Sequence, residues 1–273
     1  MEMILEMLSY PFIVRALTGG MMVSLCAALL GVSLVLKRYS MIGDGLSHVS
    51  FGALSVALAA GWSPLKVSIP VVTLAAFFLL RITENSRVKS DAAIAMISAS
   101  ALAAGIIVTS LSTGMTTDVS SYMFGSILAM SREDVILSGV LSLIVLCLFV
   151  FCYNKLFAVT FDENFARAAG VRVEVYKVLI AVLTAVTIVL GMRMMGAMLI
   201  SSLIIFPALT AMRVFKSFRG VVWCAGVLAG VCFFSGMVLS YGWSVPAGAS
   251  IVLVNLAAYI LFSLVDRAGS RPG

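Results

Sequence analysis

Nine long apolar stretches recur along the 273 residues of this chain. They lie at roughly 11–36, 43–61, 65–82, 92–111, 135–154, 175–192, 194–212, 221–241 and 246–265. A helix needs about 20 consecutive apolar residues to cross a bilayer. Only 11% of the residues are charged, against about 25% in soluble domains. We therefore expect an all-α polytopic membrane protein, a single transmembrane domain over residues 1–273. About eight to ten helices should span the bilayer, because the seventh stretch carries Gly, Ser and Pro and could be broken or re-entrant.

The basic residues predict how these spans are oriented. Lys and Arg gather in cytoplasmic loops of membrane proteins. If the 155–177 loop is cytoplasmic and the spans alternate, most of the 18 basic residues fall on that side. The exceptions are Arg15, Lys66, Arg132 and Arg193. The N-terminus is then outside and the C-terminus cytoplasmic, and the net charge of +6 reports topology rather than nucleic-acid binding.

One apolar segment contains two residues of a type that binds metal ions. Asp44 and His48, the only histidine, are four residues apart, so they share one face of a helix. Ionisable residues at membrane depth often mark an ion path, and carboxylate oxygen with imidazole nitrogen suits divalent zinc or manganese. The simpler interpretation is a capping aspartate beside a packed histidine. Ser47 could line the same path, or bond its own helix backbone.

The motifs of the common enzyme classes are absent from the sequence. No G-x-x-x-x-G-K-[ST] segment is present, so the chain does not bind ATP through a P-loop. One histidine cannot form H-E-x-x-H, and no G-x-S-x-G occurs. We therefore assign no catalytic residue and no intrinsic cofactor, and transport is favoured over catalysis.

Two segments on the predicted cytoplasmic side carry exposed aromatic residues. In the first, Thr160 and Glu163 form a capping box, and Gly170 ends the short helix. Phe161 and Phe165 share one face of it. In the second, a basic turn presents Phe215 and Phe218 after Pro207, which we expect to break or kink its helix. These segments could lie on the lipid surface or contact a cytoplasmic partner.

The long outer segment, 112–134, contains a second predicted capping box. Ser131 and Asp134 would begin the following span. Asp118 could cap a short helix over 122–130, contact an external partner or admit cations.

Several motifs together resemble the permease subunits of bacterial zinc and manganese ABC importers, which are type II importers. The first is Leu36-Lys-Arg-Tyr-Ser-Met-Ile-Gly-Asp44-Gly-Leu-Ser-His48-Val-Ser-Phe-Gly52. Others are Asp118-Val-x-x-Tyr-x-Phe-Gly125 with Ser131-x-Glu-Asp134, and Ala166-x-Ala-x-Gly170-Val. Further motifs are Met195-Gly-Ala-Met-Leu-Ile-Ser-Ser-Leu-Ile-Ile-Phe-Pro207-Ala-x-Thr-Ala211 and Val245-Pro-Ala-Gly-Ala-Ser250.

The resemblance implies an importer in the bacterial cytoplasmic membrane. Two copies of the chain would form a homodimer bound to a separate cytoplasmic P-loop ATPase, which binds the ATP. An extracytoplasmic metal-binding protein would deliver the ion. Asp44 and His48 match the family's path residues. The turn at 207–220 would be the main ATPase-coupling element with 160–170 nearby, which involves Phe215, Lys216, Phe218, Arg219, Phe161 and Phe165.

The transported ion is expected to be zinc. Gly45-Leu46 and Val49-Ser-Phe-Gly52 resemble the corresponding residues of zinc-associated members. Manganese and iron members more often have other residues at these positions. A manganese or iron importer is the alternative within the family, and a self-sufficient cation transporter is the alternative outside it. By simple alternation Asp44 starts near the cytoplasmic end of its span. If Gly43 and Gly45 unwind the helix there, the site could lie nearer the midplane.

Overall fold

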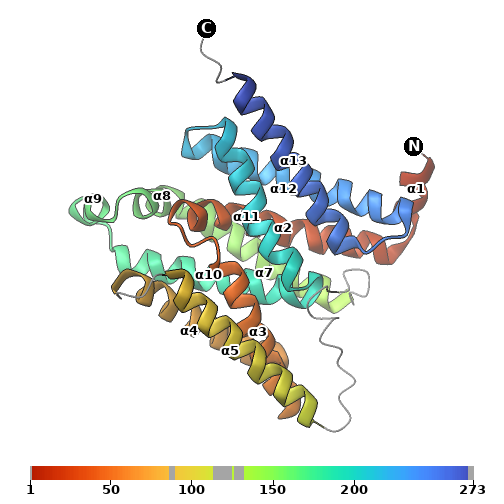
Figure 1. Cartoon of the computed structure of the whole chain (residues 1–273), viewed down its shortest axis with the longest axis horizontal. Helices are drawn as coiled ribbons and strands as arrows, with labels where there is room; N and C mark the ends of the chain where they lie inside the picture. Colours follow the sequence, from red (N-terminus) through yellow and green to blue (C-terminus); the bar gives the residue numbers. More distant parts are fainter. Residues whose placement is uncertain (1, 86–89, 113–124, 126–131, 270–273) are drawn as a thin grey trace.

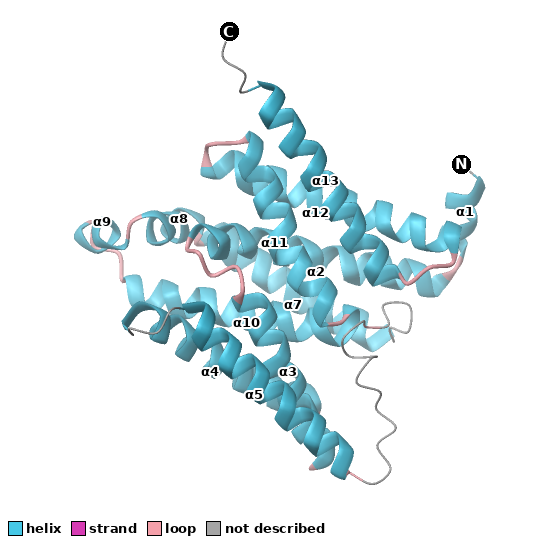
Figure 2. Ribbon diagram, viewed as in Figure 1, coloured by secondary structure: helices cyan, strands magenta, loops and turns pink. Residues whose placement is uncertain are grey.

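The computed structural model describes residues 2–85, 90–112, 125 and 132–269. Every regular element in this part of the chain is a helix (Figure 2). The helices are α1 (Glu2–Ser9), α2 (Pro11–Leu36), α3 (Ile42–Ala59), α4 (Pro64–Asn85), α5 (Ser90–Leu111), α7 (Arg132–Phe151), α8 (Tyr153–Phe161), α9 (Glu163–Ala168), α10 (Val173–Met195), α11 (Ala197–Val214), α12 (Phe218–Trp243) and α13 (Ala247–Gly269).

Each of the nine predicted stretches lies mostly within one long helix. Seven helices of the described chain are long and apolar enough to cross a membrane. The count rises to eight if α7 and α8, which meet at a 70° bend, form one span. The apolar part of α4, Pro64–Leu79, is shorter. Among the described residues, seven spans fall below the predicted eight to ten, and the count of eight with the bent pair reaches the lower limit. The multi-pass all-α architecture is confirmed.

Four helices form the centre of the bundle. In each of α2, α3, α10 and α11, 61–72% of the most apolar 18-residue segment is buried inside the molecule. The corresponding segments of α5 and α13 are only 22% and 17% buried. Figure 1 shows α4 and α5 beside α3 at one side of the bundle and α13 at the other. The outer helices therefore present apolar faces that the chain itself does not cover, as expected of helices that face lipid.

The seventh stretch, 194–212, is interrupted at Gly196 between α10 and α11, and the rest of it lies in α11. Pro207 lies within α11, which continues to Val214, so the helix does not break there, and a kink at Pro207 stays a prediction. The chain bends before that helix instead, at Gly196, where φ is +86°. This positive φ favours glycine, and a Cβ atom at Gly125 would lie 2.1 Å from the carbonyl carbon of Met195. Gly125 thus lies directly against the junction of α10 and α11.

The predicted features of the outer segment fall mainly outside the described residues. Ser131 and Asp118 are among the residues that are not described. The capping box and the role of Asp118 therefore stay predictions.

Candidate functional site

Asp44 and His48 lie one turn apart in α3, and their side chains are close together. Oδ2 of Asp44 is 3.7 Å from Nε2 of His48. Zinc binds carboxylate oxygen at about 2.0–2.2 Å and imidazole nitrogen at about 2.0–2.1 Å. The gap is shorter than the sum of those two bond lengths, so one ion can contact both atoms. The Asp44 side chain is 44% exposed and the His48 side chain 15%, which leaves the pair open on the carboxylate side.

A single chain does not complete a metal site around this pair. Among the described residues, no group of three or more His, Cys, Asp or Glu side chains is placed to hold a metal ion. Zinc in proteins usually takes four ligands. Two ligands from one chain leave positions that water, a second copy of the chain or another subunit would have to fill.

The glycines beside Asp44 serve close helix packing. A Cβ atom at Gly43 would lie 3.0 Å from Cδ1 of Ile204 on α11, and one at Gly45 would lie 2.6 Å from Cγ2 of Ile94 on α5. The helix is regular from Ile42 onwards. The expectation that these glycines unwind α3 is therefore wrong, because they instead remove the Cβ atoms that would separate α3 from its neighbours.

The start of α3 nevertheless lies well inside the bundle. Gly43 contacts Ile204, which is near the middle of α11. Asp44 in the first turn is thus level with the interior of a candidate span and not with its end. The helix N-terminus also carries partial positive charge, which favours a carboxylate in the first turn.

Ser47 is buried, and its hydroxyl already has a partner. Its Oγ donates a hydrogen bond of 2.7 Å to the backbone carbonyl of Asp44. This is the local bond that serine commonly makes within helices. A path-lining role for Ser47 stays a prediction, and the observed bond favours the structural alternative.

The short helix α9 is capped by a different residue from the one predicted. Oδ1 of Asp162 accepts a 2.9 Å hydrogen bond from the backbone N–H of Phe165, so Asp162 is the N-cap. The hydroxyl of Thr160 is buried without a hydrogen-bond partner. The predicted capping box of Thr160 and Glu163 is therefore wrong, whereas Gly170, with φ +80°, does end the helix as expected.

Glu163 instead joins three separate parts of the fold. Its Oε1 is 2.6 Å from Nζ of Lys37 at the end of α2, and its Oε2 is 2.6 Å from Nζ of Lys177 on α10. Both lysine side chains are 11% exposed. Burial raises the pKa of the Glu163 carboxyl, but the hydrogen bonds and charges of Lys177 and Lys37 outweigh it and lower the pKa overall. The local sequence pattern could not indicate this role, because both lysine partners of Glu163 are distant in sequence.

The predicted coupling residues divide into exposed and buried members. Phe165, Phe161 and Phe215 are 69%, 58% and 42% exposed, and Lys216 is exposed as well. Phe218 is only 6% exposed. Its ring lies 5.0 Å from that of Phe157 and 6.1 Å from that of Phe161. Phe218 therefore packs the start of α12 against α8, and its side chain is not available at the surface to contact a partner.

Comparison with known proteins covers nearly the whole chain. Residues 9–266 match the ABC 3 transport family. The probable iron transport system membrane protein of Haemophilus influenzae is 31% identical, with 95% of this chain and 96% of that protein covered. The zinc uptake membrane protein ZnuB of the same organism is 28% identical over 94% of this chain and 98% of its own length. The manganese import permease ScaB of Streptococcus gordonii is 30% identical over 95% and 93%.

A solved structure shares the fold. The chain superimposes on PsaBC from Streptococcus pneumoniae, in complex with Fab, with a TM-score of 0.85 and 29% sequence identity, covering 96% of this chain and 94% of that one. These likenesses confirm the resemblance to permease subunits of metal-ion ABC importers. The match over 9–266, together with the multi-pass helical bundle, establishes that the chain belongs to the ABC 3 transport family.

Proposed function

We propose that this chain is the membrane-spanning subunit of an ATP-driven importer of divalent metal ions, with zinc as the ion. The observation that carries the proposal is the pair of Asp44 and His48, whose donor atoms are 3.7 Å apart in the bundle interior. Carboxylate and imidazole are ligands that zinc accepts readily. Relatives are named for iron, zinc and manganese transport, so the choice of zinc rests on the resemblance of residues 45–52 to zinc-associated members.

The remaining ligands would come from a second copy of the chain. A two-fold axis beside α3 would bring two carboxylates and two imidazoles together, which satisfies the four ligands of a divalent ion. We accordingly propose a homodimer, with an extracytoplasmic metal-binding protein as the donor of the ion. The N-terminus would be outside and the C-terminus cytoplasmic.

ATP hydrolysis would reside in a separate cytoplasmic P-loop ATPase. The exposed side chains of Phe161, Phe165, Phe215 and Lys216 form the surface best suited to contact it. The predicted contact through Phe218 is supported less, since Phe218 is buried, whereas Arg219 is exposed. Glu163 links this surface to α2, whose end leads directly into α3 and Asp44.

The test is uptake of radiolabelled zinc into proteoliposomes that contain the chain, its ATPase and the loaded delivery protein. We expect uptake to require ATP and to fall sharply in Asp44→Asn and His48→Ala, with Glu174→Gln as the carboxylate control. Uptake without ATP would favour a self-sufficient cation transporter. Strong competition by manganese or iron would reverse the choice of metal. Full uptake by both variants would show that Asp44 and His48 are not needed for the ion to pass.

A further inference from the structure

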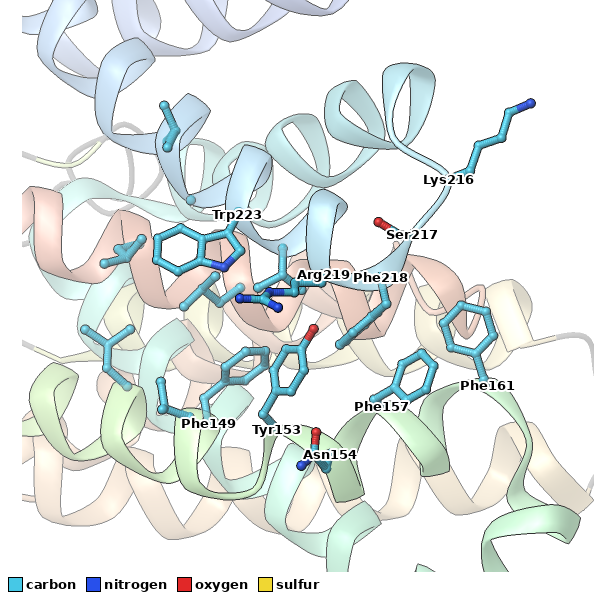
Figure 3. A pocket seen from close by; sticks show the side chains of 17 residues that line it. Phe149, Tyr153, Asn154, Phe157, Phe161, Lys216, Ser217, Phe218, Arg219 and Trp223 are labelled. Carbon is cyan, nitrogen blue, oxygen red and sulfur yellow. The ribbon is translucent and has the colours of Figure 1, made fainter.

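A deep cavity lies between α2, the junction of α7 with α8, and the start of α12 (Figure 3). Its volume is about 1260 Å³. The chain turns by 70° at Cys152 between α7 and α8, so α8 runs away from α7 while α2 and α12 continue. This divergence leaves a groove that side chains of the described residues line but do not fill.

Most of the groove is apolar and opens on the lipid-facing side of the bundle. Leu29 and Phe149 line its depth, and Val150, Trp223 and Val227 line its mouth. The mouth residues are 67%, 69% and 60% exposed. Trp223 and Val227 lie on α12, which is long and apolar enough to span a membrane, and Val150 lies on α7, which meets that test together with α8. In a bilayer such an opening meets acyl chains, not water.

One end of the groove is cationic and rich in hydrogen-bond donors. Figure 3 shows the guanidinium of Arg219 reaching into the groove between Trp223 and Tyr153, whereas Lys216 points away from it. None of the 17 residues that line the cavity is acidic. The N-terminus of α12, where the Ser217 hydroxyl accepts a 3.2 Å hydrogen bond from the N–H of Gly220, adds partial positive charge at the same end. Trp223, one turn further on, is typical of the membrane interface.

We propose that this groove binds one anionic phospholipid. Its phosphate would accept hydrogen bonds from the Arg219 guanidinium and the Tyr153 hydroxyl, and an acyl chain would lie along Leu29 and Phe149. The combination of an apolar groove with a single cationic end matches the two parts of such a lipid. A soluble partner fits less well, because the mouth is formed by the exposed apolar side chains of Val150, Trp223 and Val227. The site is separate from Asp44 and His48, and Phe161 and Lys216 of the surface proposed for the ATPase lie at its edge.

The test is native mass spectrometry of the purified chain titrated with phosphatidylglycerol and, separately, with phosphatidylcholine. We expect phosphatidylglycerol to bind more tightly and Arg219→Gln to weaken it roughly tenfold, the size of one charge-assisted hydrogen bond. Lys216→Gln is the matched control, since it removes the same charge at a lining residue whose side chain points away from the cavity (Figure 3), and it should bind like the native chain. Val150→Trp, at the exposed mouth, should weaken binding of both lipids.

Three outcomes would overturn the proposal. The first is equal binding of the two lipids by the native chain, and the second is native affinity in Arg219→Gln that retains its melting temperature. The third is displacement of phosphatidylglycerol by inorganic phosphate at equal concentration, which would indicate a free-anion site. A photoreactive residue at Val150 should cross-link to lipid in membranes, and a cross-link to a second copy or to the ATPase would assign the groove to a protein partner.

Discussion

Glu163 Oε1 lies 2.6 Å from Lys37 Nζ, which ties the first residue of α9 to the end of α2. The second carboxylate oxygen binds Lys177 at the same distance. One side chain thus connects the cytoplasmic surface proposed for the ATPase with the segment that leads into Asp44.

We expect Glu163→Gln to destabilise the protein by about 1–2 kcal/mol, between the values for exposed and buried ion pairs. The substitution leaves two lysines, each 11% exposed, without their shared carboxylate. Thermal unfolding of the purified chain measures the effect. Glu174→Gln is the control, because Glu174 is 73% exposed and its loss should change little. Equal melting temperatures for the native chain and Glu163→Gln would contradict a stabilising role.

The Glu163 bridge should also make stability depend on pH. Because the lysines hold the pKa of this carboxyl below its ordinary value of 4.5, the folded state binds the proton less readily than the unfolded state. The stabilisation is therefore fully present above pH 4.5 and is lost as pH falls through the lowered pKa. Melting curves of the native chain and Glu163→Gln should differ near neutral pH and converge in acid. A gap that stays constant down to acid pH would assign the effect to packing and not to charge.

Loss of either proposed metal ligand should reduce zinc uptake at least tenfold, since even changes to outer-shell partners of metal sites cost about 10–100-fold. Asp44→Asn and His48→Ala should behave alike and should not combine additively, because each alone breaks the same site. Initial uptake rates and zinc binding to the purified chain provide the two readouts. Additive effects would mean that the two residues act at different steps.

Two glycine substitutions should have opposite effects on stability. A Cβ atom at Gly52 would lie 2.7 Å from the backbone carbonyl oxygen of Ala101, so Gly52→Ala should cost about 1–3 kcal/mol by separating α3 from α5. A Cβ atom at Gly230 would meet nothing within 4 Å, so Gly230→Ala should stabilise α12 by up to about 1 kcal/mol. Thermal unfolding compares them. The Gly226-x-x-x-Gly230 motif suggests close packing at Gly230, and a destabilised Gly230→Ala would show that another molecule packs there.

Several local features of this protein can be predicted from its sequence alone. Hydrophobic length predicts the spans because each helix satisfies its own backbone hydrogen bonds within the membrane. The spacing of Asp44 and His48 predicts their proximity because helix geometry is regular. The family could likewise be predicted, since its motifs are runs of neighbouring residues.

How these local features combine depends on contacts between segments that are distant in sequence. Glu163 fits a capping pattern in sequence, yet it bridges Lys37 and Lys177, which lie far away along the chain. Gly43 and Gly45 suggest an unwound helix, yet they allow close contact with Ile204 and Ile94. The groove beside Arg219 arises from the angle between α7 and α8. Each of these depends on contacts between segments distant in sequence, and no local pattern of residues encodes which segments will meet.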